Sequence, residues 1–386
     1  MKRSNVVISG LALTGAAVYA TRSPGPAFSH IPTNGWNAAV QTNGPQEVST
    51  HAIVDVNHEV TPAFMMTGLD QPWSVEAALE WMDKESIASS LLSVSPRLFS
   101  ELSREQTAKA HRRCNEYLAE LVATYQGRFG MLASLPVANA ADGLAERAYA
   151  VDSLGADGVM LASSHAGTFL GESLFEPLFQ ELNRRRINVL IKPSRHPTSD
   201  ELSISLPDQL VEQPCDITRA AINMIFKGSL ERYPDVRWIL SEGGGFLPFV
   251  AWRLSLANMM PGLTDKAPQG VLHYLRRFWV DTSRSYNPVA LATLGELFDP
   301  AKALFGSGYP SGISAPDQLS RTLEKQWSSR LLKGIQYQHA LSLFPRLAKE
   351  GESPIPVPQY RPQSDISKLQ AKAFKPVQQL MQKLRE

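Results

Sequence analysis

From residue 52 onward, short apolar runs alternate with longer segments in which apolar residues recur at helical spacing. Such alternation is typical of a parallel sheet with crossover helices, and repeated eight times it suits a closed barrel. The expected strands are 52–56, 87–94, 129–136, 158–161, 188–192, 236–241, 278–281 and 303–306. The expected helices are 74–85, 104–125, 141–154, 174–186, 216–232, 246–260, 289–298 and 316–329. We therefore predict a (β/α)₈ TIM barrel of the α/β class.

The size and composition agree with one large domain rather than two. A barrel of about 250 residues with extensions accounts for the 386 residues. Lysine and arginine number 38 against 37 aspartate and glutamate, so no overall charge would attract nucleic acid. Cys114 and Cys215 lack metal or redox spacing, and are interpreted as buried thiols or one incidental bridge. No nucleic-acid partner is expected.

The two ends of the chain differ in composition from the expected barrel over residues 51–348. Residues 1–20 place Lys2 and Arg3 before 15 apolar residues, which is the layout of a secretory signal, with an uncleaved anchor as the alternative. Residues 21–50 are expected to be a linker or arm, and residues 349–386 a proline-rich and amphipathic tail. We therefore expect an exported protein, periplasmic if bacterial, or one associated with a membrane through residues 1–20.

Chemistry in a barrel of this kind lies at the carboxyl ends of the strands. Five segments there contain polar residues and turn signals. These segments are IVDVNHEVTP (53–62), LIKPSRHP (190–197), LSEGGGFLP (240–248), FWVDTS (278–283) and ALFGSGYP (303–310).

In their order and spacing, these strand ends resemble the amidohydrolase-related family that includes aminocarboxymuconate-semialdehyde decarboxylase and γ-resorcylate decarboxylase. The resemblance runs from about residue 52 to residue 345, and it includes the stretch DITRAAINMIFKGSLERYPDVRWILSEGGGFLP. It implies a barrel of the metal-dependent-hydrolase type with N- and C-terminal extensions. It also implies a metal site for hydrolysis or decarboxylation.

This sequence departs from the family at each metal-site position. The family's His-x-His pair is replaced by Asn57 and Glu59, its strand-five histidine by Lys192 and its strand-six histidine by Glu242. The aspartate after strand eight is replaced by Gly308. A protonated lysine cannot bind a metal, so no metal and no cofactor are expected, although weak binding of a hard cation between the two glutamates stays open.

The replacements suggest an internal ion-pair cluster instead of a metal. We hypothesise that Glu59, Lys192 and Glu242 occupy the metal's volume, since a buried charge needs a partner. The hypothesis requires the Lys192 nitrogen to lie within about 4 Å of at least one of these carboxylates.

Other candidate residues each have two interpretations. Asp281 is a candidate catalytic residue that would orient a substrate, or it caps the next helix. His58 is expected to point away from the site as part of the barrel wall. His165, His196 and Arg253 are candidate pocket residues, or they are ordinary surface side chains.

The missing ligands lead to three functional hypotheses. The first is a catalytically inactive homologue that serves as a structural or regulatory subunit and binds a protein partner, either a second copy or an active paralogue, through the arms at 21–50 and 349–386. The second is a metal-independent enzyme or small-molecule binder in which Lys192 and Glu242 act as base, acid or Schiff-base former. The third is a hydrolase or decarboxylase of the family.

Overall fold

The computed structural model describes residues 53–66, 73–100, 102–202, 204–260, 262–311 and 329–348, all within one compact unit. The predicted signal or anchor segment, the arm at 21–50 and the tail at 349–386 lie outside the described residues. So does the predicted helix 316–329, apart from its last residue. None of the helices within the described ranges has the length and hydropathy needed to cross a membrane.

Eight parallel strands form one sheet in the order β1-β2-β3-β4-β7-β8-β9-β10, as the alternating sequence pattern predicts. Sequential neighbours pair in register around the sheet, with β4 next to β7 because β5 and β6 form a separate hairpin. The bounds are β1 Ile53–Val60, β2 Ile87–Val94, β3 Phe129–Ser134, β4 Gly158–Ala162, β5 Ser164–His165, β6 Thr168–Phe169, β7 Asn188–Lys192, β8 Arg237–Leu240, β9 Trp279–Asp281 and β10 Ala303–Leu304.

Backbone hydrogen bonds between β1 and the segment after β10 close the sheet. The amide of Val56 donates to the carbonyl of Phe305 at 2.9 Å, and that of Glu59 to Tyr309 at 2.8 Å. The buried Asp55 carboxylate adds two bonds, accepting from the Ser307 amide at 2.9 Å and from its hydroxyl at 2.6 Å. The predicted barrel is therefore confirmed, because these bonds join its first and last strands.

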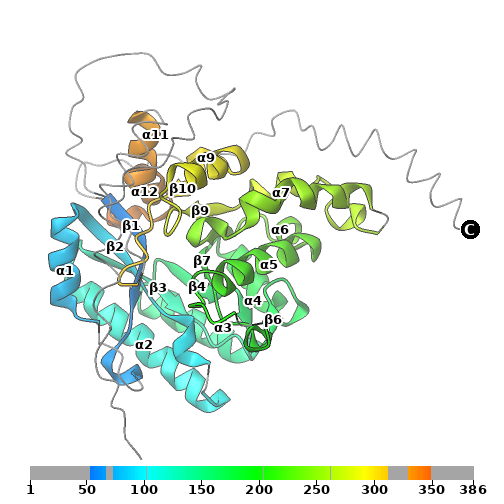
Figure 1. Ribbon diagram of the computed structural model, residues 1–386. Coiled ribbons are helices and arrows are strands. Elements are labelled where there is room, and N and C mark those ends of the chain that lie inside the picture. The colour runs from blue at the N-terminus through cyan, green and yellow to red at the C-terminus, as the bar shows by residue number, and fades with distance from the viewer. Residues whose placement is uncertain are drawn as a thin grey trace, which may run out of the picture. The chain divides into compact units, whose positions relative to one another are not determined.

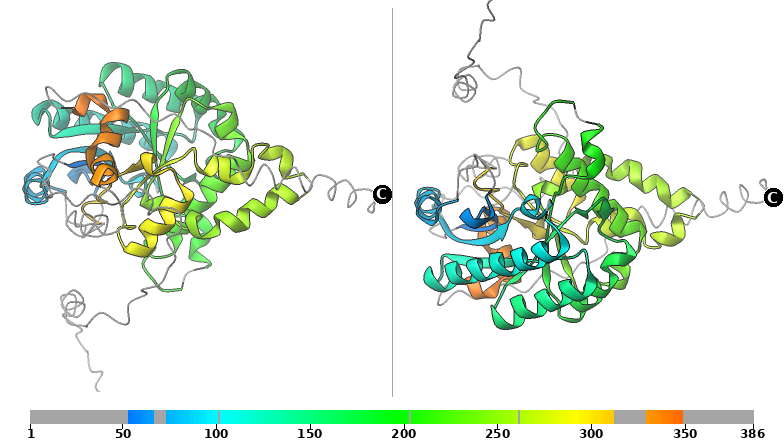
Figure 2. Two further views of the ribbon diagram at one scale, coloured as in Figure 1. Left: turned by 90° about the horizontal axis from the view of Figure 1, so that it is seen from above. Right: turned by 90° about the horizontal axis from the view of Figure 1, so that it is seen from below.

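Helices pack around the outside of the strands (Figures 1 and 2). Local signals fix several of their ends: Ser103 begins α2 with a reciprocal capping box to Gln106, and Asn287 begins α9 by accepting from the Ala290 amide. The bounds are α1 Val75–Lys84, α2 Arg104–Thr124, α3 Ala140–Ala148, α4 Glu176–Arg184, α5 Glu212–Phe226, α6 Ser229–Arg232, α7 Leu247–Ser255, α8 Val271–Leu275, α9 Pro288–Leu297, α11 Ser329–Lys333 and α12 His339–Leu343.

The core lies on both sides of the strands, as expected for a parallel sheet covered by helices. Every residue of β3 and of β7 is buried, including the polar Ser134 and Lys192 at their carboxyl ends. The apolar runs therefore form the wall of the barrel. This wall holds in place the polar residues at the carboxyl ends of the strands. The two cysteines are free thiols, Cys114 buried and Cys215 partly buried.

Short elements depart from the sequence prediction. The β5–β6 hairpin and helices α8 and α12 were not expected, because two to five residues carry too little periodicity to indicate a structure. Helix α5 begins at Glu212 rather than at residue 216, and a separate helix, α6, follows it after the left-handed Gly228.

Candidate active site

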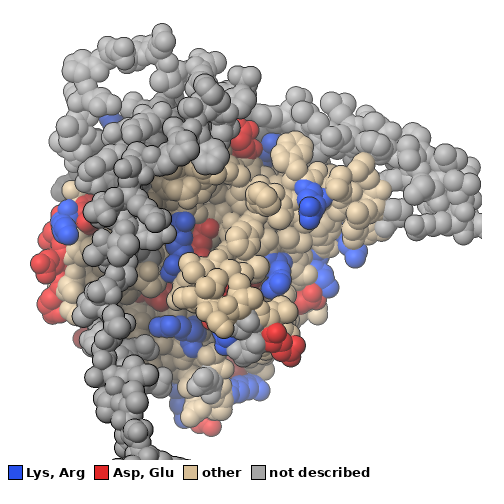
Figure 3. Space-filling view, in the orientation of Figure 1, with Lys and Arg blue, Asp and Glu red and all other residues tan. Residues whose placement is uncertain are grey.

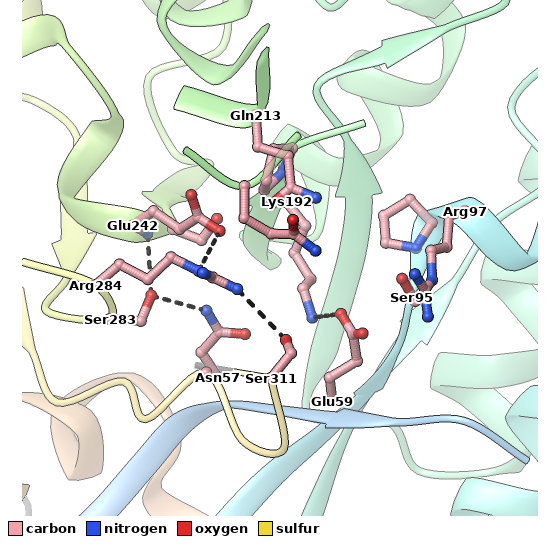
Figure 4. A pocket seen from close by; sticks show the side chains of 15 residues that line it. Asn57, Glu59, Ser95, Arg97, Lys192, Gln213, Glu242, Ser283, Arg284 and Ser311 are labelled. Atoms are coloured by element: carbon pink, nitrogen blue, oxygen red, sulfur yellow. Dashed lines mark hydrogen bonds and ion pairs between the residues drawn. The ribbon is translucent and has the colours of Figure 1, made fainter. Parts of the chain in front are cut away.

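A pocket that is partly open to solvent lies at the carboxyl ends of the strands. Side chains from five strand ends and from the loop after β2 converge on it (Figure 4). Its lining consists of Asn57, Glu59, Ser95, Pro96, Arg97, Lys192, Pro193, Gln209, Gln213, Ser241, Glu242, Ser283, Arg284, Gly308 and Ser311.

All five positions that the sequence resemblance assigns to the family's metal ligands line this one pocket: Asn57, Glu59, Lys192, Glu242 and Gly308. Alternation along β1 gives Asn57 and Glu59 the same face, and the parallel strands bring the other positions to the same end of the barrel. The prediction that these residues share one site is confirmed.

The Lys192 ammonium is one half of a buried ion pair. Its Nζ donates to Glu59 Oε2 at 2.7 Å and to Ser93 Oγ at 3.4 Å, and the residue is only 5% exposed. The expected contact between Lys192 and at least one carboxylate is therefore confirmed. It joins the end of β7 to the end of β1 across the pocket.

Glu242 does not complete the expected three-residue cluster, because it pairs with Arg284. The Arg284 Nε lies 3.1 Å from Glu242 Oε1, and the Glu242 side chain is 11% exposed. Burial raises the pKa of Glu242 to about 7, although the nearby Arg284 charge opposes that rise. Near neutral pH this carboxyl group can therefore give or take a proton.

Both members of the second pair have left-handed backbone, with φ of +53° at Glu242 and +56° at Arg284. Residues other than glycine rarely adopt this conformation, and such strain concentrates at functional sites. Gly243 and Gly244 continue the turn with positive φ, and a Cβ atom on Gly243 would come within 2.4 Å of Ser285 Oγ. The glycine-rich turn therefore directs the Glu242 side chain into the pocket.

Asp281 lies behind the pocket lining and accepts hydrogen bonds from residues that form it. Its carboxylate accepts from Asn57 Nδ2 at 2.9 Å, from Ser283 Oγ at 2.6 Å and from the Glu242 amide at 3.0 Å. The helix-capping interpretation of Asp281 is wrong, because Asn287 caps α9. Burial raises the pKa of Asp281, and the donors around it lower that pKa. Asp281 holds these three pocket residues in position and does not itself line the pocket.

Two buried polar atoms in the pocket wall have no hydrogen-bond partner among the described residues: Asn57 Oδ1 and Ser241 Oγ. Asn57 is 4% exposed and Ser241 is fully buried. The bonds from Asn57 Nδ2 to Asp281 and to Ser283 Oγ fix which amide atom is nitrogen. Figure 4 shows the oxygen on the other side of the amide, away from Ser283.

The three other candidate pocket residues do not line this pocket. His196 stacks on Phe169 and bonds to Thr198 Oγ1 at 2.7 Å, so its ring is held in the loop after β7. His165 belongs to the β5–β6 hairpin, and Arg253 is exposed on α7. The pocket interpretation of these three residues is wrong, because position in a loop near a strand end does not fix where a side chain points.

His58 lies in the barrel wall, as strand alternation predicts. It is fully buried, accepts from Trp73 Nε1 at 3.1 Å, and its ring centroid lies 4.6 Å from that of Tyr309. Burial lowers its pKa to about 3, so the ring is neutral at physiological pH. His58 therefore supports β1 from the side opposite the pocket.

Arg97, Arg284 and Gln213 line the pocket but were not singled out in the sequence. Arg284 lies three residues past the end of β9, and Arg97 three residues past the end of β2. Inspection of the turn after β2 would have found Arg97, and extending the inspected segment 278–283 by one residue would have found Arg284. Elsewhere, Figure 3 shows lysine and arginine interspersed with acidic residues on the described part of one face.

Residues 54–323 match the amidohydrolase family. The chain is an amidohydrolase-family protein. It is 31% identical over 315 residues to 6-methylsalicylic acid decarboxylase of Penicillium expansum, covering 77% of this chain and 97% of that one. It is 32% identical over 321 residues to the decarboxylase yanB of Aspergillus niger, covering 76% and 87%. The fold matches 2,6-dihydroxybenzoate decarboxylase from Rhizobium with a TM-score of 0.68 at 19% identity, covering 76% and 98%.

These relatives correct the first functional hypothesis. Replacement of the metal ligands suggested an inactive structural or regulatory subunit, but the relatives that match most of this chain are decarboxylases. That hypothesis is wrong, and the findings favour an enzyme. The error lay in equating loss of the metal ligands with loss of catalysis.

The residues at the site do not fit the metal that the family implies. A solved decarboxylase from Polaromonas contains bound manganese. In this chain, the positions that the resemblance assigns to metal ligands offer one amide, two carboxylates and a lysine, and each carboxylate is already paired with a cation. No group of three or more histidine, cysteine, aspartate or glutamate residues suited to a metal occurs in the described ranges. A tight site for a transition metal needs several such ligands.

Proposed function

We propose that this member of the amidohydrolase family is a carboxy-lyase that removes the carboxyl group from a small aromatic carboxylic acid without a metal ion. One observation carries the proposal: Glu242, whose pKa is raised to about 7, faces a pocket that also contains three cationic side chains. A proton donor and an anion-binding surface are what decarboxylation requires once the metal is absent. The names of the relatives, which include 6-methylsalicylic acid and γ-resorcylate decarboxylases, support the reaction class.

The charges that line the pocket favour an anionic substrate. With Glu242 protonated, Arg97, Lys192 and Arg284 face a single ionised carboxylate, that of Glu59. Arg97 has no hydrogen bond or ion pair from its guanidinium to any described residue, and it lies at an exposed position of the lining. A carboxylate entering the pocket would therefore meet an excess of positive charge.

Glu242 would supply the proton that replaces the carboxyl group. It donates the proton to the ring carbon that bears the carboxylate, the bond from that carbon to the carboxyl carbon then breaks, and its electron pair returns to the ring. Carbon dioxide leaves, and the Glu242 carboxylate takes a proton from water. The reaction consumes one proton and needs no oxidant or reductant.

Arg284 and Asp281 would act on Glu242 in opposite directions. Arg284 stabilises the carboxylate formed after proton transfer, whereas the negative charge of Asp281 and burial favour the protonated form before it. The bond from the Glu242 amide to Asp281 also fixes the backbone that carries the donor. The Glu242 carboxyl group is thus held in place, and its pKa lies close to neutral pH.

The test is decarboxylation of 6-methylsalicylate and 2,6-dihydroxybenzoate by the purified full chain, followed as carbon dioxide released. We expect turnover that declines as the pH rises through about 7, and a loss of about 10²- to 10⁴-fold in Glu242→Gln. Glu80→Gln, at an exposed carboxylate on α1, is the matched control and should keep full activity. Full activity in Glu242→Gln, or no turnover of any hydroxybenzoate by the wild-type chain, would reject the proposal.

A further inference from the structure

The amide oxygen of Asn57 is a buried acceptor that has no donor among the described residues. The side chain cannot rotate to satisfy it, because its nitrogen is held by Asp281 at 2.9 Å and by Ser283 at 3.2 Å. Leaving a polar atom buried and unpaired costs about 1–3 kcal/mol, so such an atom in a pocket wall is a place where a ligand gains affinity by donating.

In the same pocket, one N–H group of the Lys192 ammonium has no acceptor among the described residues. Of its three N–H groups, one reaches Glu59 and one reaches Ser93, and no further partner occurs in the part of the chain that the structure describes. Because the residue is only 5% exposed, little water competes for the third N–H group. An anionic acceptor from a ligand would complete its set of hydrogen bonds.

We infer that Asn57 and Lys192 together form a metal-free anchor for an acid that carries a hydroxyl group beside its carboxylate. The hydroxyl donates to Asn57 Oδ1, and the carboxylate accepts from Lys192 Nζ. The inference rests on the proposed function for the reaction class, and adds which substrates the site selects and which residues select them.

The pairing follows from what each residue can offer. Asn57 Oδ1 only accepts, so it distinguishes a hydroxyl from a methoxy group or a hydrogen atom at the same position. Ser241 Oγ can both donate and accept, and therefore does not discriminate. A bound cation would also satisfy an amide oxygen, but the positive charges of Lys192 and Arg284 in the same lining oppose it.

The experiment compares the binding of three acids by calorimetry to full-length protein treated with a chelator. The acids are 2-hydroxybenzoate, 2-methoxybenzoate and benzoate. We expect 2-hydroxybenzoate to bind at least about tenfold more tightly than the other two, as one hydrogen bond to a buried unpaired acceptor implies. Adding manganese should leave all three affinities unchanged.

Two variants assign the effect to its residues. In Asn57→Ala the preference for the hydroxyl should fall to about onefold, whereas in Asn183→Ala, on the outer helix α4, it should persist. In Lys192→Met all three acids should bind about tenfold more weakly, with the preference retained. Equal binding of the three acids by the wild type, or binding that requires manganese, would overturn the anchor.

Binding and turnover separate the two claims. A hydroxyl preference without any carbon dioxide release would leave the anchor standing and reject the decarboxylase. Release of carbon dioxide with no hydroxyl preference would do the reverse. If Asn57→Ala fails to fold, the comparison of 2-hydroxybenzoate with 2-methoxybenzoate on the wild-type protein still decides the inference.

Discussion

The pocket has two halves, and each contains an acid and a base in contact. In the strand half, Glu59 and Lys192 belong to β1 and β7 and have ordinary extended backbone. In the loop half, Glu242 and Arg284 lie just past β8 and β9 in left-handed backbone. The strand pair is 2.7 Å apart and the loop pair 3.1 Å.

The difference indicates a division of labour between the halves. The backbones of a pair on two strands of one closed sheet are held in fixed relative positions, which suits an anchor. The Glu242–Arg284 pair lies on turns with left-handed backbone, and Asp281 binds the Glu242 amide. This backbone conformation lowers stability, but it places the pair where the proposed reaction needs it. Removing one partner should therefore have opposite effects on stability in the two halves.

The largest effect is expected in the strand half. Lys192→Met leaves the Glu59 carboxylate, 19% exposed, without its cation, and we expect the free energy of unfolding to fall by about 3 kcal/mol. Urea denaturation at pH 7 measures the loss. A change below about 0.5 kcal/mol would show that the pair contributes no more than an exposed one.

The double variant Glu59→Gln/Lys192→Met is the control for that experiment. It removes both charges together, so most of the stability lost in Lys192→Met should return. If the double variant is as unstable as the single one, the loss comes from the packing of the lysine chain and not from the unpaired carboxylate.

The sequence predicts the strand half well. Apolar runs ending in polar residues located the strands, and strand alternation placed Asn57 and Glu59 together opposite Lys192. Parallel strands share one carboxyl end, so residues far apart in sequence meet there whatever the helices between them do. The Glu59–Lys192 contact could therefore be predicted from the amino-acid sequence alone.

The loop half could not be predicted in the same way. The direction of Glu242 depends on positive φ angles at four successive residues, 242–245, and these follow from contacts with Ser285 and α5 that no local pattern records. The choice of Arg284 over Lys192 as partner of Glu242 has the same origin. The proton affinity of Glu242 depends on burial and on Asp281, which take effect only once the chain has folded.

In the loop half, the substitution Glu242→Gln should raise the free energy of unfolding, whereas Lys192→Met in the strand half should lower it. The pKa of Glu242 is raised from 4.5 to about 7 in the folded protein, so the penalty for its charge is absent below 4.5, grows as the pH rises from 4.5 to about 7, and is fully present above that. We expect the variant to be more stable than the wild type by about 1–3 kcal/mol at pH 8, with the difference narrowing toward pH 4.5. Thermal unfolding at pH 8 and pH 5 measures it. A variant less stable than the wild type at pH 8 would show that the Arg284 pair outweighs burial.

The smallest effect concerns the turn that carries Glu242. In Gly243→Ala the new methyl group would meet Ser285 Oγ at 2.4 Å, and the residue would also keep its φ of +63°. Gly155→Ala is the matched control, because it has φ of +72° and nothing within 4 Å of the added atom. Left-handed backbone should destabilise both by about 1 kcal/mol, and the clash should add about 1 kcal/mol in Gly243→Ala alone.

Activity separates these two variants further. Gly243→Ala should lower kcat for decarboxylation, because relief of the clash moves the turn and with it the Glu242 carboxyl group, while Gly155→Ala should leave kcat unchanged. Affinity for 2-hydroxybenzoate should be similar in both, since the anchor lies in the strand half. If Gly243→Ala weakens that affinity as much as it lowers kcat, the two halves of the pocket do not act independently, and the division between anchor and acid fails.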